Sequence, residues 1–224
     1  MRLLQGRPLF LHSVECAKRV SSVRHILVST DDLELAEVAM NNSCWVPELR
    51  PRELARGDIP MSDVINYAAA LMENQPDGAP DALLLLDPTS PLRDPEAVSE
   101  AIAYLTRDPS LDGVISISVP SFNPIWVGVQ VDEDGYLARH TIGKSGYSRR
   151  QDVPPYWRIN GSFYVWRTSF ALSLSRNWLD EGKHGYVETP ELLSHSIDLE
   201  DDFRLVEALV ESDMVNLPWI GGKT

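Results

Sequence analysis

The chain has 224 residues, of which 43% are hydrophobic and 24% are charged, proportions that suit an ordinary soluble globular protein with a large core. Its formal net charge of −13 disfavours nucleic acid or an anionic membrane as partner, because both are bound through a net basic face. No apolar run approaches the roughly 18 residues of a membrane span, and no signal-peptide pattern is present. We therefore expect a cytoplasmic protein whose two cysteines, Cys16 and Cys44, are reduced core thiols.

The first third of the chain alternates between helix and strand patterns. Pro8 suits the first turn of a helix, and Ser62 is the expected N-cap of a later one. A short apolar run at 25–30 predicts a strand, after which Asp31 or Asp32 can cap the next helix. The helices expected in this part of the chain cover residues 8–20, 33–42 and 61–74.

The middle of the chain repeats the same alternation. The run "DALLLLD" predicts a strand over 81–87, and "GVISISV" predicts another over 113–119. Between them we expect a helix over 93–105, with Asp94 as N-cap and Pro95 as first residue. Strands that are apolar on both faces and alternate with amphipathic helices indicate an α/β fold with a mostly parallel sheet covered on both sides.

After residue 120 the pattern becomes richer in strands. The stretch 125–140 predicts two strands around an Asp-Glu-Asp-Gly turn. A further strand is expected over 161–167 and a closing helix over 201–212. Because no internal repeat or linker interrupts the chain, we expect one domain over residues 1–224.

The leucine-rich strand ends on Asp87, in a turn of sequence Pro-Thr-Ser-Pro. Ligands of parallel sheets bind at the carboxyl ends of the strands. A carboxylate there could hold Mg²⁺, which prefers one or two carboxylates together with phosphate oxygens. Thr89 and Ser90 add hydroxyl donors. The alternative is that Asp87 only caps the turn, and this stretch alone leaves both interpretations open.

A second acidic cluster lies in "SIDLEDDF", residues 196–203. Asp198 and Glu200 share one side if the segment is extended, because side chains alternate along a strand. Asp201 and Asp202 then suit the positive N-terminus of a helix. A charged helix start would explain the cluster equally well on its own. Two carboxylate groups in one chain nevertheless favour a shared metal site, of the kind that assists phosphoryl transfer.

Five stretches match, in order, the motifs of one enzyme family. They are VSTDD (28–32), LRPRELARGDIPMSDVI (49–65), LLLLDPTSPLR (83–93), SRRQDVPPYWRINGSFYVW (148–166) and SIDLEDDF (196–203). Together they resemble the acylneuraminate cytidylyltransferases, which are also called CMP-sialic acid synthetases. The resemblance extends from about residue 2 to 210.

The resemblance implies a fold and a reaction. The fold is a three-layer, Rossmann-like nucleotidyltransferase fold of the GT-A type, with a small β-rich segment at about 120–165 for the acceptor sugar and for dimerisation. In the reaction, the anomeric hydroxyl of a nine-carbon α-keto acid sugar attacks the α-phosphate of CTP, so that pyrophosphate leaves and a CMP-sugar forms. Such chemistry depends mostly on positioning and charge neutralisation. Mg²⁺ and a homodimer are implied as well.

The resemblance also assigns roles to residues. The predicted catalytic residues are Asp87 and Asp198. The nucleotide is expected to contact Arg50, Leu54, Ala55 and Ser62. The metal ligands are expected to be Asp198 and Glu200, with Asp202 and Asp87 as further candidates. The acceptor pocket is expected to include Arg149, Gln151, Tyr156, Asn160, Ser162 and Phe163. A planar guanidinium such as that of Arg149 or Arg150 can pair with the sugar carboxylate through two hydrogen bonds.

Three features depart from the family pattern. Asp87 stands where sialic-acid enzymes usually have Gln, so that this residue could bind metal or select another sugar. Glu200 replaces the second Asp of the metal motif. The family begins with a strand and a basic glycine-rich loop that cradles the triphosphate, whereas "MRLLQGRPL" resembles the segment just after that loop. Arg2 and Arg7 are candidate phosphate contacts or simply exposed charges.

The third departure has a structural consequence and leaves three hypotheses open. The strand that precedes the loop is normally central in the sheet, so its neighbours are expected to have unpaired backbone groups. The chain is a CMP-nonulosonate synthetase whose reading frame starts upstream, a non-catalytic relative that pairs with a complete enzyme, or a nucleotidyltransferase that uses another sugar. The general base and the identity of the sugar do not follow from the sequence.

Overall fold

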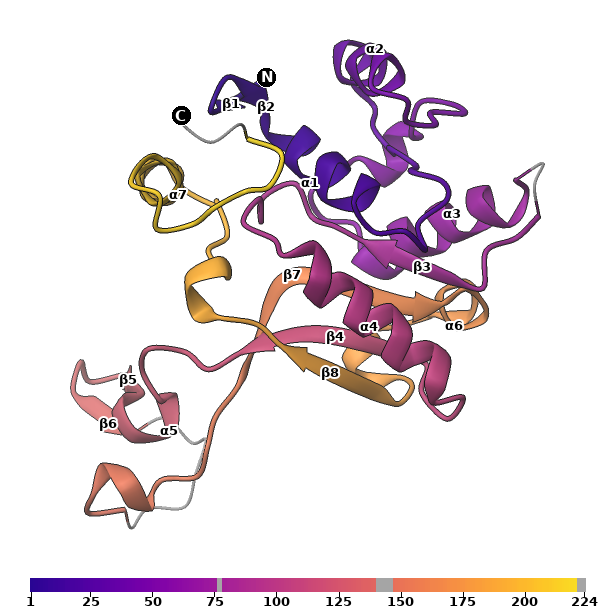
Figure 1. The fold of residues 1–224 in the computed structure, drawn as a ribbon. Coiled ribbons are helices and arrows are strands. Elements are labelled where there is room, and N and C mark those ends of the chain that lie inside the picture. The colour runs from indigo at the N-terminus through magenta and orange to yellow at the C-terminus, as the bar shows by residue number, and fades with distance from the viewer. Residues whose placement is uncertain (76–77, 140–146, 221–224) are drawn as a thin grey trace.

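A four-stranded sheet lies at the centre of the computed structural model, which describes residues 1–75, 78–139 and 147–220 (Figure 1). Its strands, in spatial order, are β3 (Ala82–Leu85), β7 (Arg158–Arg167), β4 (Gly113–Ser118) and β8 (His184–Glu188). β3, β4 and β8 run in one direction, and β7 lies antiparallel between β3 and β4. The sheet is therefore mixed. Three of its four strands run in the same direction, as expected of a mostly parallel sheet, but two of its three strand pairs are antiparallel.

Helices cover both faces of this sheet and give three layers. On one face, Phe163 and Val165 of β7 pack with α4 (Pro95–Arg107) and α7 (Glu200–Glu211). On the other face, Trp166 packs with α3 (Met61–Glu73) and α6 (Thr168–Ser173). Residues of alternating parity on β7 thus supply the two cores, as the two-residue period of a strand requires. The predicted α/β class is confirmed.

The remaining elements lie around the three layers. They are the hairpin β1 (Leu3–Leu4) and β2 (Arg7–Pro8), α1 (Leu9–Lys18), α2 (Leu33–Asn41), α5 (Pro124–Val127), β5 (Val129–Val131) and β6 (Leu137–Arg139). Single turns of 3₁₀ helix occur at Arg52–Leu54, Arg150–Asp152, Trp178–Asp180 and Glu191–Leu193. The hairpin of β5 and β6 stands away from the sheet, next to α5 (Figure 1). None of the helices in the described ranges is long and apolar enough to span a membrane.

The helix starts show where local sequence signals are reliable. Asp32 and Asp94 cap α2 and α4, as predicted. Asp32 accepts hydrogen bonds from Glu34 N and Leu35 N, and Asp94 accepts one from Glu96 N. The helix predicted over 61–74 is confirmed as α3, but its predicted N-cap is wrong, because Pro60 is the N-cap and Ser62 falls inside the first turn. Ser62 is buried there, and its hydroxyl donates to the Asp63 carboxylate at 3.4 Å.

The strand predicted over 25–30 does not form as a strand. Leu27 makes a single parallel bridge with Trp45, through bonds from Val28 N to Trp45 O (3.0 Å) and from Trp45 N to Ile26 O (2.8 Å). One bridge is too short a ladder to count as a strand. β3 pairs with β7 on one side, and no other described residue pairs with it. β3 is therefore an edge strand of this sheet among the described residues.

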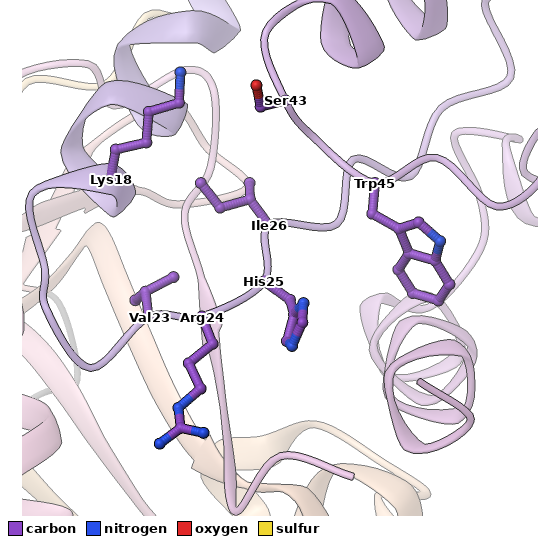
Figure 2. A pocket seen from close by; sticks show the side chains of 7 residues that line it. All are labelled: Lys18, Val23, Arg24, His25, Ile26, Ser43 and Trp45. Carbon is purple, nitrogen blue, oxygen red and sulfur yellow. The ribbon is translucent and has the colours of Figure 1, made fainter. Parts of the chain in front are cut away.

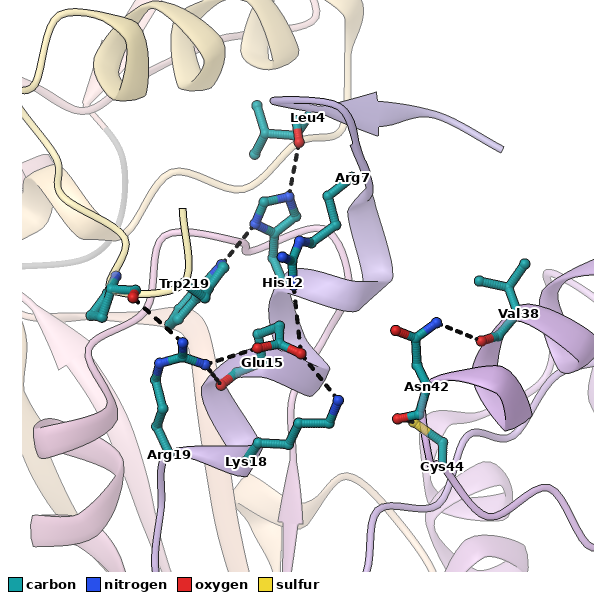
Figure 3. A network of polar contacts seen from close by, with 11 residues as sticks. Leu4, Arg7, His12, Glu15, Lys18, Arg19, Val38, Asn42, Cys44 and Trp219 are labelled. Carbon is teal, nitrogen blue, oxygen red and sulfur yellow. Dashed lines mark hydrogen bonds and ion pairs between the residues drawn. The ribbon is translucent and has the colours of Figure 1, made fainter. Parts of the chain in front are cut away.

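The end of the described chain packs onto its beginning (Figures 1 and 3). Trp219 Nε1 donates to Nδ1 of the buried His12 at 2.9 Å, so His12 Nε2 carries the proton and donates to Leu4 O at 3.1 Å. Arg19 donates to Pro218 O at 3.4 Å. These bonds join α1 to the segment that follows α7. Both cysteines are free and buried, as predicted.

Candidate active site

The turn after β3 holds Asp87 in a fixed orientation. Asp87 Oδ1 accepts hydrogen bonds from Thr89 N (3.0 Å) and from Thr89 Oγ1 (2.9 Å). Ser90 N donates to the Asp87 carbonyl oxygen at 3.2 Å, which closes the turn. The Asp87 side chain is half-buried. The capping role that the sequence left open is therefore real, and it uses one oxygen of the carboxylate.

The second acidic segment lies directly beside this turn. Ile197 N donates to Thr89 O at 2.7 Å, and Ser196 Oγ donates to Thr89 Oγ1 at 3.3 Å. Asp198, which follows Ile197, is exposed. The structure thus brings the segments of Asp87 and Asp198 together at the carboxyl end of β3, where ligands of such sheets bind.

Glu200 and Asp202 have other partners. α7 begins at Glu200, so this residue is helical and not part of an extended segment with Asp198 as predicted. Arg2 pairs with both carboxylate oxygens of Glu200 and lowers its pKa. Asp202 Oδ2 accepts from Asp198 N (3.0 Å) and Leu199 N (2.7 Å), which caps α7.

These contacts define which side chains could hold a metal ion. Within residues 1–75, 78–139 and 147–220, no group of three or more His, Cys, Asp or Glu side chains is arranged to hold one. The two carboxylates of Asp87 and Asp198 nevertheless fit Mg²⁺, which takes one or two carboxylates and completes its shell with phosphate oxygens and water.

The predicted nucleotide contacts fall into three places, since Ser62 is buried in the first turn of α3. Arg50, Leu54 and Ala55 lie on one segment, which Arg50 N anchors to Thr30 O at 2.8 Å. Arg50 Nε is buried and finds no hydrogen-bond partner in the part of the chain that the structure describes. Leaving such a donor unpaired costs about 1–3 kcal/mol, so a ligand oxygen at Arg50 would be stabilising. Arg2 lies elsewhere, against α7.

The predicted acceptor residues also divide into two groups. Asn160, Ser162 and Phe163 lie on β7 and are buried. Asn160 Nδ2 donates to Thr189 Oγ1 (2.7 Å) and Ser194 Oγ (3.0 Å), and its Oδ1 accepts from Ser162 N (3.1 Å). The protein itself therefore satisfies the Asn160 side chain, and Phe163 belongs to the core.

The other three acceptor candidates lie near the surface. Arg149 pairs with Asp152 at 3.2 Å, and Gln151 is exposed. Tyr156 lines a cavity of about 200 Å³ together with Val119, Pro120, Phe122, Asn123, Arg150, Val153, Pro154 and Pro155. The structure does not gather all six acceptor candidates around one space.

A larger cavity of about 310 Å³ contains none of the predicted site residues (Figure 2). It is lined by Lys18, Val23, Arg24, His25, Ile26, Ser43 and Trp45. Lys18 is the last residue of α1, whereas Ser13, in the middle of that helix, bonds to the Asp87 turn. This cavity is therefore separate from the acidic site.

One residue beneath the Asp87 turn was not assigned a role by the sequence. Arg93 is buried, with 2% of its surface exposed, and it donates to Asp87 O, Ser162 O and Ser13 Oγ. Burial lowers its pKa to about 10, so the guanidinium is charged at neutral pH. The only signal in the sequence was that Arg93 directly follows Pro91 and Leu92 in the turn, and a buried arginine is rare unless it is paired.

Comparison with known proteins identifies the family. No protein-family model matches the chain. The chain is 33% identical over 219 residues to the CMP-N,N'-diacetyllegionaminic acid synthase of Legionella pneumophila, covering 94% of this chain and 88% of that protein. It is 25% identical over 210 residues to N-acylneuraminate cytidylyltransferase A of Danio rerio, covering 94% and 46%. The solved structure of a CMP:2-keto-3-deoxy-manno-octonic acid synthetase with CTP matches with a TM-score of 0.68 at 17% identity, covering 95% and 91%, which confirms the nucleotidyltransferase fold. The chain therefore belongs to the acylneuraminate cytidylyltransferase family, as its five motifs indicate.

Proposed function

We propose that the protein transfers CMP from CTP to a nonulosonic acid, with release of pyrophosphate. The observation that carries this proposal is the junction of the Asp87 turn with the Asp198 segment through Thr89. It brings two acidic segments to the ligand-binding edge of a nucleotidyltransferase fold. Membership of a family of CMP-sugar synthases supplies the reaction class.

The residues present support specific roles. Asp87 and Asp198 would hold Mg²⁺, which neutralises phosphate charge when it is bound. Arg50 would donate its unpaired Nε–H to the nucleotide. Thr89 fixes the Asp87 carboxylate, so that little reorganisation is needed when substrates bind.

The acceptor is proposed to be a legionaminic-type acid. The support is the 33% identity to a diacetyllegionaminic acid synthase over most of both chains, and the carboxylate at position 87. An amide can donate a hydrogen bond to a sugar oxygen, whereas the Asp87 carboxylate can only accept one. An acceptor that donates to this position, or that contacts it through a cation, is therefore favoured.

The active form is proposed to be a cytoplasmic homodimer that forms through the hairpin of β5 and β6. Large apolar side chains on this hairpin are exposed, among them Val131 (67%) and Leu137 (75%). Apolar surface on a hairpin that stands away from the sheet favours burial against a second copy. A reaction that consumes CTP and the presence of two free cysteines support a cytoplasmic location.

The test is pyrophosphate release from CTP and Mg²⁺ with a panel of N,N'-diacetyllegionaminic, pseudaminic and N-acetylneuraminic acids. We expect release with at least one of them, and the fastest turnover with the legionaminic acid. Folded protein that releases pyrophosphate with none of them would contradict the proposal. That result would favour the non-catalytic alternative, for which the pairing of Glu200 with Arg2 is the supporting observation.

A further inference from the structure

We propose that Arg93 is a positioning residue that fixes the distance between the Asp87 turn and strand β7. Arg93 belongs to neither element, since it lies between the turn and α4. Its side chain donates to the Asp87 carbonyl oxygen and to the Ser162 carbonyl oxygen. A third bond goes to Ser13 Oγ in α1 at 2.8 Å. One buried cation therefore connects three parts of the chain.

The chemistry of the partners suggests that geometry, and not charge pairing, is the purpose of this arginine. All three acceptors are uncharged oxygens, and none of the ion pairs formed by the described residues involves Arg93. Burying a cation without a directly paired carboxylate is costly, even though the nearby Asp87 charge favours the guanidinium, so apolar packing would hold these elements together at lower cost. A guanidinium differs from apolar packing in one respect, because its planar fork of donors fixes the directions of several acceptors at once.

The two carbonyl oxygens that accept from Arg93 lie close to the residues that the reaction would use. The Asp87 carbonyl begins the turn that carries the Asp87 carboxylate, and Ser162 follows the buried Asn160 on β7. A displacement of about 1 Å in a reacting assembly can cost about 10²-fold in rate. If the proposed function is correct, on which this step rests, loss of Arg93 shifts the Asp87 turn, and with it a proposed Mg²⁺ ligand, relative to β7 without removing a substrate contact.

The chain offers a matched control in Arg167. This arginine also donates to three carbonyl oxygens, those of Leu105, Asp108 and Leu111, at 2.8–3.1 Å. It stands opposite Ala82, at the start of β3, whereas the Asp87 turn follows the end of that strand. Arg93→Met and Arg167→Met therefore remove the same kind of network at opposite ends of β3.

The kinetic test compares wild type, Arg93→Met, Arg93→Lys and Arg167→Met in the pyrophosphate assay. We expect Arg93→Met to lower kcat about 10²-fold while KM for CTP changes less than about twofold. Arg93→Lys keeps the charge but not the planar fork, so it should melt close to wild type and still lose about tenfold in kcat. Arg167→Met should lower the melting temperature and leave kcat unchanged. An unchanged kcat in Arg93→Met, measured on folded protein, overturns the inference.

A second measurement does not depend on activity. Hydrogen exchange of the amides at residues 89, 90 and 197, which bond within or to the turn, should be at least tenfold faster in both Arg93 variants than in wild type and Arg167→Met. Unchanged exchange overturns the inference whether or not the enzyme is active. If exchange is faster in the Arg93 variants as expected, but wild type releases no pyrophosphate with any sugar, the proposed function fails and the structural role of Arg93 stands.

Discussion

Replacing Asn160 with alanine should destabilise the fold by about 2–4 kcal/mol. The side chain is buried, with 3% of its surface exposed, and makes three hydrogen bonds. Alanine leaves the Ser162 N–H group buried without an acceptor, which costs about 1–3 kcal/mol. The two lost bonds to Thr189 and Ser194 add about 1 kcal/mol together, because Ser194 Oγ still donates to Pro190 O at 3.1 Å.

Urea unfolding followed by circular dichroism measures this loss. For a chain of this size, 2–4 kcal/mol lowers the melting temperature by roughly 5–15 °C. Asn74→Ala is the control, since Asn74 is exposed and only donates to the Ala70 carbonyl of its own helix, and it should stay within about 0.5 kcal/mol of wild type. A loss below about 1 kcal/mol in Asn160→Ala, together with a large rise in KM for the sugar, would refute a structural role and restore the substrate contact implied by the family motif.

Three further changes test other parts of the molecule. Asp198→Asn should lower kcat about 10²-fold, whereas Glu200→Gln should keep most of the activity, because the Glu200 carboxylate is already paired with an arginine. Acid should destabilise wild type more than His12→Gln, because burial lowers the pKa of His12. Below about pH 6.5 the unfolded chain therefore binds a proton that the native state does not, and stability is lost as pH falls. Gly113→Ala should cost about 1–3 kcal/mol, because its new Cβ would lie 2.5 Å from an indole carbon of Trp166.

Each of these changes has a control. Equal losses of kcat in Asp198→Asn and Glu200→Gln would place both carboxylates at the metal. For the pH series, urea unfolding between pH 7.5 and 5.5 gives the free energy of unfolding at each pH. This free energy should fall less steeply with pH in His12→Gln than in wild type. Equal slopes would assign the effect to neighbours such as Glu15. Gly57→Ala is the control for the glycine change, since a Cβ there meets nothing within 4 Å. Equal stabilities of the two alanine variants would contradict the packing argument.

The parts of the fold that depend on residues adjacent in the sequence could be predicted from it. The caps at Asp32 and Asp94 are local signals, and both are correct. Strand order is not local, so the antiparallel position of β7 between β3 and β4 could not be inferred from spacing. β8 was missed because its five residues include His and Gly and alternate only weakly, as an edge strand does. α5 was expected to be part of a strand, although Asn123 and Pro124 form a helix start that the sequence displays.

In the candidate site, too, long-range contacts were harder to predict than local features. The hypothesis that the two acidic groups share a site predicted that the segments of Asp87 and Asp198 meet, and they lie side by side through the bond from Ile197 N to Thr89 O. The pairing of Arg2 with Glu200 joins residues 198 positions apart, and no pattern in the sequence connects them. The self-satisfied network of Asn160 was equally hidden, because Thr189 and Ser194 reach it only through the packing of the sheet.

Where α7 begins determines which carboxylate of the acidic segment at 196–203 remains exposed and unpaired among the described residues. Asp202 accepts from the backbone N–H groups of Asp198 and Leu199, which stabilises a helix that begins at Glu200. Glu200 thereby leaves the extended segment and turns toward Arg2. Asp198, two residues earlier and outside the helix, stays on the segment that Ile197 fixes to the Asp87 turn. The cap formed by Asp202 therefore also determines that Asp198, and not Glu200, is the carboxylate that stays beside the Asp87 turn.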